Sequence, residues 1–421
     1  MNKHIGACIL TCVFLRIVYV YEFLPCKKAA FEAPTLPLLK ISEEPCPPPA
    51  AIVQSAASNI KQELLPLSYA CSAQEISWQW RTVMWHRPTI CDWPYLWNMA
   101  QLTMPDATVF FDVGANNGIY SAKFIGLWSP AEKVNPKELS EGLKRIAELP
   151  EKTYCADQLY ASNMWACSYA NKGARGFEMI LGPCNVRHPI KVYSFDGNKI
   201  FADGMQQTIN SLFPQLNNPN SSTWQYSHAA VVGSRFENEE HVTFSAFDKS
   251  EGGKVLPGKN RDGVIVPATT VDKFCDENNI DKVDVLKIDA EGHDFEVVDG
   301  AHRTLQSRGV SIVFFEGGLF CNGDNSWLQE GGIVDVLDAL GFDCYGNGQA
   351  VTTYRLTKCF NPSVCEEFSP KNPPANANVF CVSRVHASGL SNIIFKRSAH
   401  QQATQFSSVE AFRQQYNLDE K

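Results

Sequence analysis

The sequence lacks three patterns, and each absence argues against a class of protein. No Gly-x-Gly-x-x-Gly occurs, so the pyrophosphate-binding turn of dinucleotide-dependent enzymes is missing. No Cys-x-x-Cys pair occurs, which argues against a zinc site built from paired cysteines. Basic residues are not in excess: 37 Lys and Arg stand against 45 Asp and Glu, giving a net charge of −8. We therefore expect no nucleic acid partner, because such proteins need a basic surface for the phosphate backbone.

The composition predicts a folded enzyme-sized domain with attached segments. Hydrophobic residues make up 44% of the 421 residues and charged residues 19%, which is too apolar for a disordered chain. The length exceeds what one compact domain usually needs. We expect one large catalytic domain rather than two equal ones.

The N-terminus predicts entry into the secretory pathway. An apolar run covers residues 5–21, interrupted by Arg16 and followed by Lys27 and Lys28, so we interpret residues 1–28 as a signal anchor or signal peptide. A buried N-terminal helix is the alternative. Because no Ala-x-Ala cleavage site follows, the pattern favours an anchor that holds the protein in a Golgi-like membrane over secretion.

The cysteine content agrees with a lumenal location. Thirteen of the 15 cysteines lie beyond the apolar run, and in an oxidising compartment we expect them to form disulfides. With an odd number, at least one must stay unpaired or bond another chain. The sequon at Asn220 points the same way.

Two segments precede the predicted catalytic domain. Residues 29–70 form a proline-rich stem, with six prolines between Pro34 and Pro49. Residues 71–106 form a cap rich in Trp and Cys, with five tryptophans between Trp78 and Trp97. These tryptophans could form a carbohydrate-binding platform, but packing of the cap against the catalytic domain is favoured, because large aromatic side chains are mostly core.

Residues 107–385 alternate between strand and helix patterns, which predicts an α/β fold with a doubly wound, mostly parallel sheet. The interval between the first two strands is long, so residues 127–189 are predicted to be an insertion after the first βα unit. The polar residues 386–421 are predicted to be a tail. Strands are expected at 108–111, 190–195, 228–232, 242–245, 283–288, 310–315 and 378–382, and helices at 119–125, 295–307 and 332–340.

Candidate binding residues follow the first two strands. Gly114 and Gly118 would let the backbone approach a ligand, and Asp112 stands where a carboxylate would attract a positively charged group. Asp196 ends the second strand, where an acid can accept hydrogen bonds from two ribose hydroxyls. Each feature alone also fits a structural turn or cap. Together they indicate a cofactor that contains a nucleoside.

A second cluster lies at the end of the strand at 283–288. Titratable residues crowd the segment from Lys287 to Asp294, and a neutral His293 could take a proton from a substrate hydroxyl. Glu316, after the next strand, either lines the same crevice or is a solvated turn residue.

These segments resemble the FkbM family of methyltransferases. Phe111-Asp112-Val113-Gly114-Ala115-Asn116-Asn117-Gly118 is similar to the family's cofactor loop, and the block from Val266 to Glu316, including Leu286-Lys287-Ile288-Asp289-Ala290-Glu291-Gly292-His293, is the most specific part. The resemblance covers residues 107–382 apart from the insertion. It implies a Rossmann-like class I methyltransferase fold.

The resemblance also implies a reaction and a set of residues. S-adenosylmethionine would be bound by Asp112, Gly114, Asn116, Gly118 and Asp196, and the methyl group would pass to an oxygen of a glycan or other secondary metabolite. His293, Asp289 and Glu291 would orient and deprotonate the acceptor. No metal is predicted, although an acidic pair such as Asp289 and Glu291 would suit Mg²⁺. The sequence departs from the family at Phe195-Asp196-Gly197, where Phe-Glu-Pro is commoner, but an aspartate can still reach a ribose.

Two other functions compete with this interpretation. A nicotinamide-dependent sugar-nucleotide oxidoreductase would share the fold but needs the missing glycine motif, and Tyr354 and Lys358 lie in a strand-like stretch rather than on one helix face. A non-catalytic lumenal binding protein would also share the fold, and it would tolerate substitution of Asp112 and His293.

Overall fold

The structure is a computed structural model, and it describes residues 96–146, 189–245, 263–319, 331–348, 352–359 and 376–395, with gaps at 98–99, 101–102, 105, 219–220 and 393, together with residues 253, 255 and 256. The predicted anchor, stem and most of the cap lie outside these residues, as do residues 147–188 of the predicted insertion and the chain beyond 395. None of the helices within the described ranges has the length and hydrophobicity needed to span a membrane.

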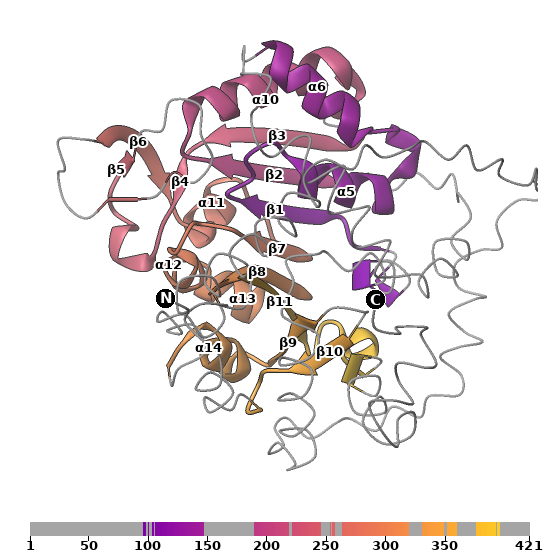
Figure 1. Cartoon of the computed structure of the whole chain (residues 1–421), viewed down its shortest axis with the longest axis vertical. Helices are drawn as coiled ribbons and strands as arrows, with labels where there is room; N and C mark the ends of the chain where they lie inside the picture. Colours follow the sequence, from indigo (N-terminus) through magenta and orange to yellow (C-terminus); the bar gives the residue numbers. More distant parts are fainter. Residues whose placement is uncertain are drawn as a thin grey trace, which may run out of the picture. The chain divides into compact units, whose positions relative to one another are not determined.

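An eight-stranded sheet organises the domain, and its strands follow one another from β3 at the top of Figure 1 to β10 at the bottom. Neighbouring strands pair as parallel from β3 to β8, whereas β11 is antiparallel to both β8 and β9, and β10 is antiparallel to β9. The prediction of a doubly wound, mostly parallel sheet is confirmed. In spatial order the strands are β3 (Thr223–His228), β2 (Lys191–Asp196), β1 (Val109–Val113), β7 (Val285–Ile288), β8 (Ile312–Leu319), β11 (Asn376–Ser383), β9 (Phe342–Gly348) and β10 (Thr352–Arg355).

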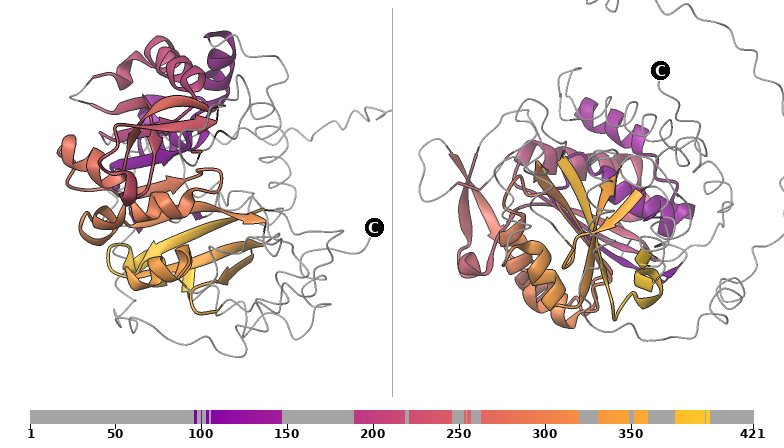
Figure 2. Two further views of the ribbon diagram at one scale, coloured as in Figure 1. Left: turned by 90° about the vertical axis from the view of Figure 1, so that its left-hand side faces the viewer. Right: turned by 60° about the horizontal axis from the view of Figure 1, so that its bottom comes forward.

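Helices cover both faces of the sheet (Figure 2). Successive side chains of a strand point to opposite faces of the sheet. In β1, Phe110 belongs to one buried cluster and Phe111 to the other. One face packs against α5 (Ile119–Trp128), α6 (Pro136–Ile146) and α10 (Lys199–Leu212). The opposite face packs against α11 (Val271–Glu277), α12 (Asp294–Asp299), α13 (His302–Ser307) and α14 (Ile333–Ala339).

A small second sheet stands beside the carboxyl end of β2. It consists of β4 (Ala230–Val231), β6 (Gly263–Thr269) and β5 (His241–Ser245), with β4 parallel and β5 antiparallel to β6. The sequence predicts one strand over 228–232, but the chain leaves the large sheet after His228 and pairs in the small one from Ala230. The hydrogen bond from the Ala229 N–H to the Asp196 carbonyl (3.0 Å) marks this change of partner.

The predicted helix over 295–307 is two helices, and the glycine between them has a steric reason. Gly300 separates α12 from α13, and a Cβ on it would lie 2.2 Å from the carbonyl oxygen of Val232. The helix pair can approach the small sheet only because glycine stands at this contact.

Three boundaries are refined by packing. The start of the predicted insertion belongs to the domain, because Leu139 and Leu143 of α6 are buried in the core beside α10. Leu96 and Trp97, from the end of the predicted cap, are buried in the same core. Leu390 and Ile394 are also buried there, so the domain continues past the predicted boundary at 385. The predicted boundary missed Leu390 and Ile394 because these apolar residues stand among polar ones after Arg384.

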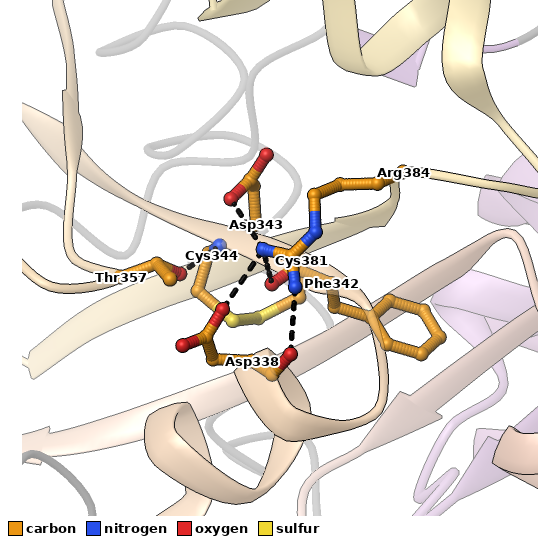
Figure 3. Close-up of a disulfide and its surroundings, with 7 residues drawn as sticks. All are labelled: Asp338, Phe342, Asp343, Cys344, Thr357, Cys381 and Arg384. Carbon is orange, nitrogen blue, oxygen red and sulfur yellow. Dashed lines mark hydrogen bonds and ion pairs between the residues drawn. A yellow bond between two sulfur atoms is a disulfide. The ribbon is translucent and has the colours of Figure 1, made fainter. Parts of the chain in front are cut away.

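A disulfide ties two neighbouring strands of the antiparallel edge. Cys344 of β9 and Cys381 of β11 are directly opposite in the strand register and form the bond shown in Figure 3. Beside it, the Arg384 guanidinium donates to the carboxylates of Asp338 (2.9 Å) and Asp343 (2.9 Å) and to the Asp338 carbonyl (2.7 Å). Cys359 is also disulfide-bonded, whereas Cys275 is buried and free. The predictions of disulfides and of an unpaired cysteine are confirmed for these residues.

Removing this disulfide is expected to lower the free energy of unfolding by about 4 kcal/mol, because the bond closes a loop with a sequence separation of 37 residues and so restricts the unfolded chain. Cys344→Ala with Cys381→Ala would be compared with the parent in denaturant titration. Cys275→Ala is the control, since it changes a buried thiol without opening a loop. A loss below about 1 kcal/mol for the double variant would contradict the prediction.

Candidate functional site

The turn between β1 and α5 has the backbone of a ligand-binding loop. Gly114 (φ 67°), Asn116 (φ 46°) and Gly118 (φ 68°) all have left-handed conformations, which bend the chain sharply at the carboxyl end of β1. A Cβ on Gly114 would lie 1.8 Å from the carbonyl oxygen of Asp289, so two loops touch here through backbone alone. Gly118 instead faces the protein, because a Cβ on it would meet Met205 (2.7 Å) and Trp224 (2.9 Å).

Asp112, predicted as a cofactor ligand, lies inside the protein beneath the site. Its side chain is fully buried and accepts hydrogen bonds from the backbone N–H (3.2 Å) and the hydroxyl (2.7 Å) of Ser121 at the start of α5. On its other side lies the Lys287 ammonium, 3.2 Å from Oδ1. The carboxylate therefore holds the strand, helix and loop together beneath the site, and it lines neither of the two cavities described below.

Lys287, which lies in the titratable cluster of the sequence and had no predicted role, connects the two loops. Its buried ammonium donates to the carbonyl of Gly114 (2.8 Å) and lies 3.4 Å from the Asp289 carboxylate. Burial opposes the charge, but Asp112 and Asp289 together raise the pKa of Lys287 above its ordinary value. The lysine is therefore a permanent cation at the centre of the site.

The first cavity opens beyond the carboxyl ends of β1 and β2. Asp196 lines this cavity, and its two carboxylate oxygens accept hydrogen bonds from the backbone N–H groups of Asn116 (2.9 Å) and Asn198 (2.7 Å). Burial raises the pKa of Asp196 to about 6, against the lowering effect of these hydrogen bonds. The wall opposite is formed by Ala230, Val231 and Phe244 of the small sheet, and the pocket is completed by Phe201, Gly197 and residues of the loop after β7.

The loop after β7 carries the predicted catalytic residues. Glu291 (φ 52°) and Gly292 (φ 90°) reverse the chain, and the buried Asp294 carboxylate accepts from the backbone N–H groups of Ala290 and Gly292, both at 3.3 Å. Burial and the nearby Asp289 raise the pKa of Asp294 to about 6. This acid fixes the loop and does not line either cavity.

The three predicted catalytic residues face different sides. Asp289 and Glu291 line both cavities, whereas His293 lines only the first, on the side of Asp196. Its Nδ1 lies 3.7 Å from a carboxylate oxygen of Glu296, a contact within α12 and its N-cap. His293 is therefore positioned to contact a ligand that lies in the first cavity.

A second cavity adjoins the first along the carboxyl edge of the sheet. The two share Gly114, Asn116, Asp289 and Glu291. The second cavity is the larger, about 210 Å³ against about 80 Å³. Glu316 lines this second cavity, which agrees with the first of its two interpretations, a residue lining the crevice. The remaining lining residues are Ala115, Asn117, Ile119, Tyr120, Lys287, Ile288, Phe314, Glu316 and Asn378.

No metal-binding arrangement is found in the part of the chain that the structure describes, where no three His, Cys, Asp or Glu side chains are grouped to hold an ion. Asp289 is committed instead to the Lys287 ammonium.

The sheet order, the glycine turn after β1 and the acid at the end of β2 define a Rossmann-like methyltransferase fold. The family profile described as the methyltransferase FkbM domain matches residues 112–344, more than half of the chain. The protein belongs to this family and is a methyltransferase. No curated protein matches the sequence.

Proposed function

We propose that the protein transfers a methyl group from S-adenosylmethionine to a hydroxyl oxygen of a glycan in the lumen of the secretory pathway. Asp196 carries the proposal: it is a partly buried acid at the end of β2, and it lines a cavity to which Phe201, Val231 and Phe244 contribute apolar side chains. Membership of a methyltransferase family supports the same donor.

The residues of the first cavity fit the donor. Each Asp196 oxygen already accepts one backbone N–H and keeps a lone pair for a ribose hydroxyl. Phe201, Val231 and Phe244 offer an apolar slot for a flat ring. Glycine at position 114 allows the loop after β1 to lie against the loop after β7, because a side chain there would collide with the backbone of Asp289. Asp289 and Glu291 give the site a negative charge that suits a cationic sulfonium.

When bound, S-adenosylmethionine would supply an activated methyl group on a sulfonium sulfur. The protein's task is then to hold donor and acceptor in line and to remove the hydroxyl proton. Gly114, Asn116, Asp289 and Glu291 lie at the border of the two cavities and would set the alignment. Oriented reactants can gain several kcal/mol, on the order of 7–11, from such positioning.

The lumenal setting rests on two features. The disulfides at Cys344–Cys381 and at Cys359 fit an oxidising compartment, where such bonds persist. The apolar N-terminal run supports an anchor in a Golgi-like membrane or, if cleaved, secretion. A glycan is the acceptor class abundant in that compartment.

The test is a calorimetric titration of the full-length protein with S-adenosylmethionine. We expect saturable binding, reduced about 100-fold in Asp196→Ala because hydrogen bonds to a charged acceptor are lost. Asp203→Ala is the matched control, since that acid is on the exposed side of α10 and pairs with Lys199. Released glycans would then be incubated with donor carrying a labelled methyl group. Label that resists mild alkali identifies an ether, and failure of a folded protein to bind the donor would overturn the proposal.

Cofactor affinity is expected to fall as the pH drops through about 6. Above that value Asp196 is ionised and both oxygens accept; below it the bound proton removes one acceptor, so affinity declines by up to about tenfold per pH unit. Calorimetry between pH 5 and pH 8 measures this. Asp196→Asn should show weak, pH-independent binding, whereas Asp294→Asn should keep the dependence. A parent-like pH profile in Asp196→Asn would contradict the assignment.

A further inference from the structure

We propose that the second cavity binds the methyl acceptor as an uncharged sugar ring, and that Glu316 takes the proton from the reacting hydroxyl. This inference rests on the proposed function, because it needs the donor to occupy the first cavity. It adds where the acceptor lies, which chemical class the site admits and which residue acts as the base.

The position of the second cavity is the first step. It shares Gly114, Asn116, Asp289 and Glu291 with the first cavity, so ligands in the two would meet across this border. Asp196 lines only the first cavity, whereas Glu316 and Asn378 line only the second. A donor held at Asp196 therefore leaves the larger cavity for its reaction partner.

The chemistry of the lining matches a sugar ring. Tyr120 of α5 and Phe314 of β8 line one side of the cavity with ring centroids 5.4 Å apart, and although the Lys123 and Lys287 ammonium groups lie 4.9 and 5.1 Å from the Tyr120 centroid, aromatic side chains of this kind pack against the apolar C–H side of a ring. Trp97 lies behind Phe314, at 6.1 Å, and fixes its position. Asn378 and Glu316 are directly opposite each other on β11 and β8, so their side chains emerge on the same face of the sheet. An amide beside a carboxylate offers donors and acceptors to neighbouring hydroxyls.

The charge of the cavity selects among acceptors. Its lining holds three carboxylates, Asp289, Glu291 and Glu316, against one lysine. The Lys287 ammonium lies between Asp112 (3.2 Å) and Asp289 (3.4 Å), so its single positive charge balances at most one of these two carboxylates and the cavity keeps an excess of negative charge. A carboxylate, phosphate or sulfate on the acceptor would face an excess of negative charge, which excludes uronic acids and charged esters.

Glu316 is the lining carboxylate best placed to act as the base. It lines the second cavity alone, whereas Asp289 and Glu291 also line the donor cavity, Asp289 is paired with the Lys287 ammonium at 3.4 Å, and His293 lines only the first cavity. In the reaction the hydroxyl oxygen forms a bond to the methyl carbon while the carbon–sulfur bond breaks and leaves its electron pair on sulfur. The hydroxyl proton passes to a carboxylate oxygen of Glu316 and then to water, so no further reactant is needed.

The experiment uses full-length protein loaded with S-adenosylhomocysteine, the demethylated form of the donor. Binding of methyl glycosides of galactose, mannose and fucose, and of the methyl glycoside of glucuronic acid, would be measured by saturation-transfer NMR. We expect at least one neutral glycoside to bind and the uronide not to bind. Asn378→Ala should weaken binding of that glycoside at least about tenfold. Glu239→Gln is the control and should not weaken it, because Glu239 is exposed and lines neither cavity.

Turnover then tests the base with the glycoside that binds best. Glu316→Gln keeps the shape of the side chain and should bind that glycoside within about threefold of the parent, but its turnover should fall about 10²–10⁴-fold and lose the acidic limb of its pH profile. Thermal unfolding verifies that each variant is folded.

The outcomes separate the two proposals. Failure to bind S-adenosylhomocysteine removes the proposed function itself. Binding of that molecule without any neutral glycoside, or equal binding of the uronide, overturns the acceptor class. A bound glycoside that is not methylated overturns the acceptor site, and parent-like turnover in Glu316→Gln overturns the base.

Discussion

Replacing Lys287 by methionine is expected to lower the free energy of unfolding by about 3–5 kcal/mol, because the substitution leaves a buried charge without its partner. Asp112 is fully buried, and the ammonium 3.2 Å away is the cation that balances it. The carbonyl of Gly114 would also lose its donor. Methionine has a similar length and no charge, so the loss reports the electrostatic role rather than a change in volume.

Denaturant titration of Lys287→Met, Asp112→Asn and the double variant gives the free energy of unfolding of each, which completes a double-mutant cycle. The double variant should recover part of the loss, since Asp112→Asn removes the uncompensated charge. Lys199→Met is the control: it breaks an ion pair with Asp203 of 2.7 Å, but both side chains are exposed, and such pairs contribute about 0–1 kcal/mol. A loss in Lys287→Met no larger than in this control would show that the buried pair does not stabilise the fold.

Much of the fold follows from local patterns in the sequence. The apolar runs at β1, β2, β7 and β8 contribute buried side chains to the cores on the two faces of the sheet, so their assignment as strands of a mostly parallel sheet was predictable. The structure differs from the sequence-based prediction where a contact between distant segments determines the local conformation. The need for glycine at position 300, between α12 and α13, comes from the Val232 carbonyl, a neighbour that no local pattern reveals.

The candidate site was predictable as a location but not as a set of roles. Asp196 and Gly114 lie at the first cavity as expected, because strand ends of a parallel sheet converge there. Asp112 has the same sequence context whether it meets a ligand or a buried lysine. Only the pairing of β1 with β7, which puts Lys287 directly beside it, distinguishes the two roles. The lysine within the apolar stretch Val285–Ile288 is the one sequence signal of that partner.

The second cavity illustrates the remaining limit. Tyr120, Phe314, Glu316 and Asn378 come from three elements that are far apart in the sequence and share no motif. Their grouping depends on β11 entering the sheet antiparallel beside β8, which brings Asn378 opposite Glu316. A pattern search finds residues that follow one another along the chain, whereas this cavity is assembled by the order of strands.

Gly114→Ala is expected to abolish measurable cofactor binding and to destabilise the fold by at least about 2 kcal/mol. The left-handed backbone of Gly114 costs alanine about 1–2 kcal/mol by itself. The added Cβ would also lie 1.8 Å from the Asp289 carbonyl, and that loop cannot retreat freely, because the Asp289 N–H is bonded to the Val113 carbonyl (3.1 Å). The collision therefore forces apart the two loops that border both cavities.

Thermal unfolding and calorimetric titration with S-adenosylmethionine measure the two parts of this prediction separately. Gly126→Ala is the matched control: it is an exposed helical glycine in α5 with no atom near a new Cβ, so alanine there should stabilise by up to about 1 kcal/mol and leave binding unchanged. Parent-like affinity in Gly114→Ala would mean that the bound cofactor does not need the contact between these loops. Because the contact is made by backbone atoms, no substitution at Asp289 should restore binding, and rescue by Asp289→Gly would instead locate the conflict in side chains.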